Sequence, residues 1–266
     1  MERGVADDNL LVKTGDGRAW VTFNRPDKFN PLDWATLKEL RRAVEALDAN
    51  PAVRAVVFTG AGRAFSAGGD LAGYLSLYAD KPAFRLFLDD FAAVCGLMER
   101  SSTIFIAAVN GTCVAGGLEL LLACDLAFAA DTARIGDGHV NFAQIPGAGG
   151  SQRLARAIGP MRAKHLMLSG RLLDAREAER IGLVAEVAPA DALAGHVNAF
   201  VDDLVQRSAT VLASMKKLVN DTRTLEWQAG LDAEMDVVHA YATGHPDAME
   251  GLRAFAEKRR PHFAAD

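Results

Sequence analysis

Two apolar segments, each followed by a glycine-rich loop, constrain the fold of this sequence more than any other feature. Residues 54–59 and residues 104–109 consist mainly of apolar side chains, without the alternation of a strand that has one face in water. Continuous runs of this kind are typical of strands in a parallel sheet whose two faces are both covered. The sequence therefore predicts an α/β fold.

Other segments extend this pattern in both directions. Residues 19–24 alternate between apolar and polar side chains, and a glycine-containing turn separates them from residues 10–13, which predicts a hairpin. Residues 34–49 carry apolar side chains at helical spacing and are expected to form a helix. The pattern becomes helical toward the end of the chain, and the change near residue 200 predicts a helical appendage on an α/β core.

Composition argues against several classes of protein. The net charge is −5, so the basic surface of a nucleic-acid-binding protein is not expected, and basic pairs such as Lys216 and Lys217 are expected on solvated helix faces. The three cysteines have neither zinc-ligand nor disulfide spacing, so no metal site is expected. The polar N-terminus does not resemble a signal peptide, and the most apolar stretch, residues 118–130, is too short to span a membrane. We therefore expect a cytoplasmic protein.

The two glycine-rich loops are the first candidate for a functional site. They are residues 64–71 (AFSAGGDL) and residues 110–119 (NGTCVAGGLE). Glycine lets a backbone approach a ligand closely, and a helix that begins at such a loop offers unpaired N–H groups. Two such groups aimed at one point would bind a carbonyl oxygen that gains negative charge. Each glycine pair alone also fits an ordinary tight turn.

Glu119 lies within an apolar helix expected at residues 117–124. A carboxylate in such surroundings is costly unless it is paired or used in chemistry. A catalytic role and a buried ion pair are therefore both open for this residue.

Four motifs, in order along the chain, give a specific resemblance. They are residues 24–32 (NRPDKFNPL), 65–71 (FSAGGDL), 108–119 (AVNGTCVAGGLE) and 145–154 (IPGAGGSQRL). With these motifs the chain resembles the crotonase superfamily, the enoyl-CoA hydratase/isomerase family, over nearly its whole length. The resemblance implies a spiral of β-β-α repeats in residues 1–200, which carries an acyl-CoA site. It also implies that residues 201–266 are a C-terminal helical region that packs trimers, often paired into hexamers.

The resemblance also implies roles for particular residues. The oxyanion-hole N–H groups of the family fall on Gly69 and Gly116. Residues that match CoA contacts of the family are Lys28, Phe29, Ala67, Gly69 and Leu71. Lys258 and Phe263 resemble a C-terminal patch that completes the CoA site of a neighbouring subunit, although Lys258 also fits a simple solvated lysine. No separate cofactor is expected, because coenzyme A is part of the substrate.

One position departs from the pattern of the hydratases, which use two glutamates. The first matches Glu119, whereas the second falls on His139, with Asp137 as a weak substitute two residues earlier. A histidine can donate or accept a proton near neutral pH, so Glu119 and His139 still form an acid–base pair. A purely structural histidine is the alternative.

The expected reaction is hydration of a 2-enoyl-CoA to a 3-hydroxyacyl-CoA. Isomerisation of a double bond needs a single base, and hydrolysis of a thioester or carbon–carbon bond could use His139, although Ala148 has no carboxyl group to orient it. A catalytically silent CoA-binding protein is the alternative from another class. Residues 71–94 carry Tyr74, Tyr78, Phe84, Phe87 and Phe91, which fit either a surface helix on the core or the wall of an acyl pocket.

Overall fold

The structure, a computed structural model, describes residues 9–263. The N-terminal segment that was expected not to be a signal peptide lies outside the described residues, as do the outermost residues of the regions 1–200 and 201–266. Among residues 9–263, no helix is both long enough and apolar enough to cross a lipid bilayer.

A six-stranded sheet forms the centre of the molecule, with the strand order β1-β2-β3-β5-β7-β10. Its strands are β1 (Leu10–Gly15), β2 (Arg18–Phe23), β3 (Ala55–Gly60), β5 (Ile104–Val109), β7 (Leu126–Ala130) and β10 (Glu186–Ala188). β1 and β2 form the expected antiparallel hairpin, and the other neighbouring pairs are parallel. The two apolar segments are β3 and β5, which pair with each other.

A second, smaller sheet has the strand order β4-β6-β8-β9. Its strands are β4 (Ala64–Ser66), β6 (Thr112–Val114), β8 (Arg134–Gly136) and β9 (Leu173–Asp174). β4, β6 and β8 follow β3, β5 and β7 along the chain, so each turn of the chain contributes one strand to each sheet before a helix follows. This is the expected spiral of β-β-α repeats, and it places the loops after β4 and β6 side by side.

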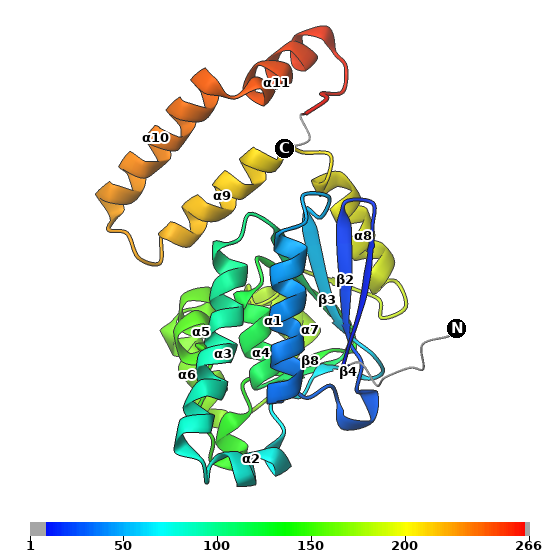
Figure 1. The fold of residues 1–266 in the computed structure, drawn as a ribbon, viewed down its shortest axis with the longest axis vertical. Coiled ribbons are helices and arrows are strands. Elements are labelled where there is room, and N and C mark those ends of the chain that lie inside the picture. Colours follow the sequence, from blue (N-terminus) through cyan, green and yellow to red (C-terminus); the bar gives the residue numbers. More distant parts are fainter. Residues whose placement is uncertain (1–8, 264–266) are drawn as a thin grey trace.

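Helices cover both faces of the large sheet (Figure 1). The helices of the body are α1 (Trp34–Asp48), α2 (Leu71–Leu77), α3 (Lys81–Arg100), α4 (Gly116–Ala123), α5 (Gly150–Ile158), α6 (Pro160–Ser169), α7 (Ala175–Arg180) and α8 (Leu193–Leu204). Two short 3-10 helices are η1 (Pro26–Lys28) and η2 (His139–Phe142). One apolar cluster joins α1, α3 and α4 to the sheet, and a second joins α8 to its other face. β3 and β5 are therefore apolar throughout because both of their faces are buried.

The chain ends in three helices that project from one end of the body (Figure 1). They are α9 (Ala209–Asp221), α10 (Trp227–Gly244) and α11 (Pro246–Glu257). They expose large apolar side chains, among them Met215, Val219, Trp227, Met235, Val238 and Phe255. The division at residue 200 stays a prediction, and α8 runs across it while packing on the sheet.

Lys216 anchors α9 to the body, so the expectation that it lies on a solvated helix face is wrong. The residue is buried, and its Nζ donates hydrogen bonds to the carbonyl oxygens of Met98 and Thr103, both at 2.7 Å. Nζ also lies 2.9 Å from Oδ2 of Asp125. The apolar stem and the paired charge explain why a lysine can occupy this place. The neighbouring Lys217 is exposed, as expected.

Candidate active site

Gly69 and Gly116 lie in two loops that contact each other. A Cβ atom built on Gly68 would lie 2.9 Å from the backbone nitrogen of Gly116 and 2.8 Å from Cβ of Ala115, so only glycine fits at position 68. Within residues 9–263, the N–H groups of Gly69 and Gly116 have no acceptor on the chain. The N–H of Gly116 belongs to the first turn of α4, where helices leave donors free for ligands.

The backbone of Ala115 sets the direction of the second loop. Its φ of 50° and ψ of −120° are unfavourable for a residue with a Cβ atom. The N–H of Ala115 donates to the carbonyl oxygen of Asp137 at 2.9 Å, and its own carbonyl oxygen accepts from the N–H of Glu119 at 3.0 Å. These bonds hold a strained turn, which is typical of backbone that is positioned for function.

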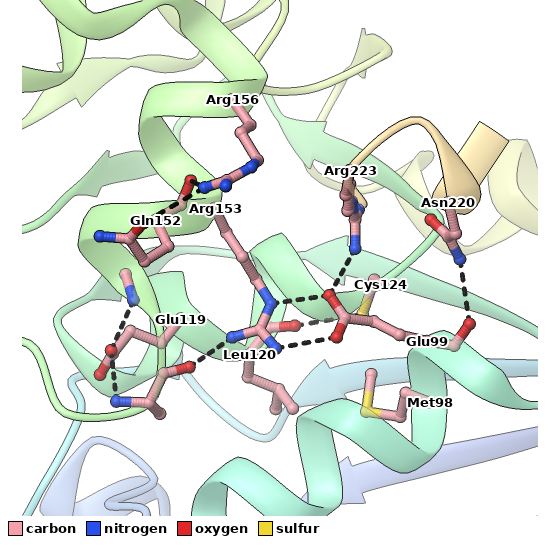
Figure 2. Close-up of polar contacts among 12 residues, drawn as sticks. Met98, Glu99, Glu119, Leu120, Cys124, Gln152, Arg153, Arg156, Asn220 and Arg223 are labelled. Carbon is pink, nitrogen blue, oxygen red and sulfur yellow. Dashed lines mark hydrogen bonds and ion pairs between the residues drawn. The ribbon is translucent and has the colours of Figure 1, made fainter. Parts of the chain in front are cut away.

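Glu119 is held in a fixed position in the first turn of α4. The residue is only 2% exposed, and its Oε1 accepts hydrogen bonds from the N–H groups of Ala148 (2.7 Å) and Gly150 (2.9 Å) (Figure 2). Burial raises the pKa of Glu119, against the opposing effects of Gly150, His139 and Ala148. Both donors bind Oε1, which leaves Oε2 available for chemistry.

Residues 145–154 supply the backbone N–H groups that bind this carboxylate. Gly149 has a φ of 96°, and a Cβ atom there would lie 2.1 Å from Nη1 of Arg153. Arg153 uses Nη1 to donate to the carbonyl oxygen of Ala148 at 2.5 Å. The glycine therefore lets the guanidinium approach the loop whose N–H groups hold Glu119.

A half-buried ion pair fixes Arg153 in turn (Figure 2). Its Nε and Nη2 donate to the two carboxylate oxygens of Glu99 at 2.8 and 2.9 Å. Arg223 donates to the same carboxylate at 2.5 Å. Burial raises the pKa of Glu99. The hydrogen bonds and charges of Arg153 and Arg223 lower this pKa by more, so it stays below its ordinary value. Neither Glu99 nor Arg153 is predicted as a site residue from the sequence; the one signal for Arg153 is its place within residues 145–154.

His139 lies beside Glu119, in the short helix η2. Its Nε2 is 3.9 Å from Oε2 of Glu119, and its Nδ1 is 3.1 Å from Oδ1 of Asp137. Asp137 is 1% exposed. The structure thus brings together the two expected acid–base residues, and it places Asp137 behind the imidazole. In the tautomer that this contact favours, Nδ1–H donates to Asp137 and Nε2 faces Glu119.

A cavity of about 400 Å³ opens in front of these groups. Gly69, Gly116, Glu119 and His139 line one part of it. Aromatic side chains of α2, of the turn that follows it and of α3 line another part, among them Tyr74, Tyr78, Phe84, Phe87 and Phe91. Phe87 and Phe91 are also buried in the core, so residues 71–94 serve both as core helices and as the wall of a pocket.

The remaining expected residues fall into two groups. Ala67 and Leu71 line the cavity, and the N–H of Ala67 donates to the carbonyl oxygen of Phe29 at 2.9 Å, which joins the loop of Lys28 and Phe29 to this site. Lys258 and Phe263 lie at the far end of α11, outside the cavity of their own chain. The structure of one chain does not bring these two residues to the site.

Two N–H groups without acceptors in residues that line one cavity, beside a buried carboxylate and an imidazole, define an enzyme that stabilises an oxyanion on a carbonyl substrate. The chain belongs to the enoyl-CoA hydratase/isomerase family, whose model matches residues 13–266. The resemblance to the crotonase superfamily is thereby confirmed.

Individual relatives agree with this assignment. The protein named "Probable enoyl-CoA hydratase echA8" from Mycobacterium tuberculosis is 40% identical over 258 residues, covering 96% of this chain and 98% of the relative. The crotonyl-CoA hydratase of Syntrophomonas wolfei is 34% identical over 261 residues, covering 97% and 99%. Among solved structures, an enoyl-CoA hydratase from Bacillus anthracis matches with a TM-score of 0.92 and 32% identity, over 97% of this chain and 100% of that one. The expected fold is confirmed.

Proposed function

We propose that this enzyme adds water to a 2-enoyl-CoA and forms a 3-hydroxyacyl-CoA. The observation that carries the proposal is the position of Glu119 and His139, whose Oε2 and Nε2 atoms lie 3.9 Å apart in the same cavity as Gly69 and Gly116. The names of the similar proteins support the same reaction.

The thioester oxygen binds to the N–H groups of Gly69 and Gly116. Attack on the β-carbon of a conjugated thioester moves an electron pair onto this oxygen and produces an enolate. Donors already aimed at the oxygen stabilise that charge more than the neutral thioester, which lowers the barrier. The rate of hydration therefore depends on both loops.

Glu119 and His139 divide the two proton transfers. A separation of 3.9 Å is too long for a direct hydrogen bond but allows one water molecule to contact both atoms. Oε2 of Glu119 takes a proton from this water as its oxygen bonds to the β-carbon. Nε2 of the protonated His139 then gives a proton to the α-carbon as the enolate collapses. Transfer of the proton from Glu119 back to His139 completes the cycle.

Asp137 acts in this scheme as a positioning residue. It accepts the Nδ1 proton of His139, so Nε2 points at Glu119 rather than away from it. The same carboxylate favours a second candidate reaction, hydrolysis, because it supplies the orienting group that Ala148 lacks. A carboxylate–histidine pair that activates water at the thioester carbon would release coenzyme A.

Coenzyme A enters this proposal as part of the substrate, held by the loops of Lys28 and Phe29 and of Ala67 to Leu71. We also propose a trimer or a dimer of trimers, in which the apolar surfaces of α9 to α11 are buried between subunits. Lys258 and Phe263 would then reach the CoA site of a neighbour. Sedimentation that gives a monomer would contradict this assembly.

The direct test compares Glu119→Gln with the wild type on a panel of enoyl-, 3-hydroxyacyl- and 3-oxoacyl-CoAs. Loss of a general acid–base group lowers turnover by about 10²–10⁴-fold. Glu45→Gln, on the exposed side of α1, makes the same exchange outside the site and keeps wild-type turnover. Near-full turnover of Glu119→Gln on every accepted thioester would rule out its role.

A further inference from the structure

The hydroxyl of Tyr74 reaches the oxyanion loops from the aromatic wall. A Cβ atom built on Gly69 would lie 1.9 Å from Oη of Tyr74 and 2.5 Å from its Cζ, so the hydroxyl lies directly against the Cα of Gly69. Tyr74 lines the same cavity as Gly116 and Glu119. It is therefore a polar group at the thioester end of the site.

Packing holds the ring of Tyr74 in this position. It stacks on Tyr78 with a centroid distance of 5.4 Å, and its edge contacts involve Phe87 at 5.7 Å and Phe84 at 6.5 Å. A tyrosine has few rotatable bonds, and neighbours on several sides restrict them further. The hydroxyl is thus preorganised in the way that a catalytic donor requires.

The hydroxyl of Tyr74 is also free to bind a ligand. In the part of the chain that the structure describes, Oη of Tyr74 has no hydrogen-bond partner, whereas Oη of the neighbouring Tyr78 donates to Gln144. A hydroxyl that borders a cavity and has no partner on the described chain keeps its O–H available to donate to a bound ligand. Burial raises the pKa of Tyr74, with smaller contributions from Tyr78, Glu119 and Asp70, so the hydroxyl keeps its proton.

We propose that Tyr74 is a third hydrogen-bond donor to the thioester oxygen, beside the N–H groups of Gly69 and Gly116. This inference rests on the proposed function. An enolate oxygen has three lone pairs and can accept three hydrogen bonds, whereas the ground-state carbonyl has two. The third donor therefore acts mainly on the enolate and contributes to kcat rather than to substrate binding.

Tyr74→Phe removes the hydroxyl and keeps the packed ring. We expect kcat for hydration of an enoyl-CoA to fall by about 10–10²-fold, below the loss for a principal oxyanion donor, with KM nearly unchanged. Tyr241→Phe, in α10 and outside the cavity, makes the same exchange and serves as the matched control. Thermal unfolding of both variants verifies that the fold is intact.

The thioester carbonyl itself gives a second measurement. In wild type, the carbonyl stretch of bound cinnamoyl-CoA is expected at lower frequency than in Tyr74→Phe, because the hydroxyl polarises the bond. Tyr241→Phe, outside the cavity, leaves this frequency unchanged. An unchanged kcat together with an unchanged frequency in Tyr74→Phe would overturn the proposal, and a change in KM alone would instead assign the hydroxyl to the acyl tail.

The same experiment separates this inference from the proposed function. If wild type does not hydrate any enoyl-CoA, the proposed reaction fails. A carbonyl frequency that still depends on Tyr74 would nevertheless show that its hydroxyl binds the thioester oxygen. If wild type hydrates the substrate and Tyr74→Phe behaves as Tyr241→Phe in both measurements, only the inference about Tyr74 fails.

Discussion

Replacing His139 with glutamate recreates the pair of glutamates expected of a hydratase, and we predict that it lowers activity. The new carboxylate would lie near Glu119, whose Oε2 is 3.9 Å from the present imidazole, and near Asp137, whose Oδ1 is 3.1 Å from it. Three carboxylates would then share one buried site. Wild type avoids this crowding because the imidazole separates the two acids.

The size of the effect follows from these distances. Two like charges about 4 Å apart, at an effective dielectric constant of about 20, repel by about 4 kcal/mol. Since one pKa unit corresponds to about 1.4 kcal/mol, the pKa values of the carboxylates rise by about three units in total. At neutral pH, the base that takes a proton from water would be largely protonated. The loss of kcat relative to wild type is therefore largest at low pH and smaller at high pH.

The assay follows hydration as the loss of absorbance of the conjugated enoyl thioester, over a range of pH. His139→Glu should be slow at neutral pH and should recover as the pH rises. Asp137→Asn added to His139→Glu removes one of the three charges and should restore part of the neutral activity. Wild-type activity of His139→Glu at neutral pH, with no gain from Asp137→Asn, would refute the reasoning.

Three further predictions concern packing and charge. Gly69→Ala places a methyl group 1.9 Å from Oη of Tyr74, so we expect a loss of about 1–3 kcal/mol in urea unfolding and a lower kcat. Lys216→Met leaves the largely buried carboxylate of Asp125 without its cation and should lower the free energy of unfolding by about 3 kcal/mol in the same assay. Because burial raises the pKa of Glu119 above 4.5, its ionised form destabilises the fold as the pH rises through the raised value. Glu119→Gln should therefore raise the melting temperature at pH near 7, and this gain should disappear below pH of about 4.5, the ordinary pKa of a glutamate.

Much of the framework could be predicted because it depends on local patterns. The apolar runs of β3 and β5 result from burial on two faces, and the glycines at positions 69 and 116 mark where two backbones approach one point. The position of His139 beside Glu119 agrees with the resemblance to the hydratases, in which the second glutamate falls on this residue.

Other parts depend on contacts that no local pattern encodes. Arg153 and Glu99 are 54 positions apart and meet only because α5 packs near the end of α3. Lys216 looks like a surface lysine until the fold brings it to the carbonyl groups of Met98 in α3 and of Thr103, which directly precedes β5. The contact of Tyr74 with Gly69 requires the exact angle at which α2 leaves its loop, which the sequence does not specify.

The most direct test of the account is the reaction of an enoyl-CoA in heavy-oxygen water, with the products analysed by mass spectrometry. We predict a 3-hydroxyacyl-CoA that carries one heavy oxygen on the β-carbon, with the thioester intact, and a loss of this product in Glu119→Gln. A heavy oxygen in a released carboxylate would indicate hydrolysis by the Asp137–His139 pair. A product of unchanged mass with a shifted double bond would indicate isomerisation, and either result would contradict hydration by Glu119 and His139.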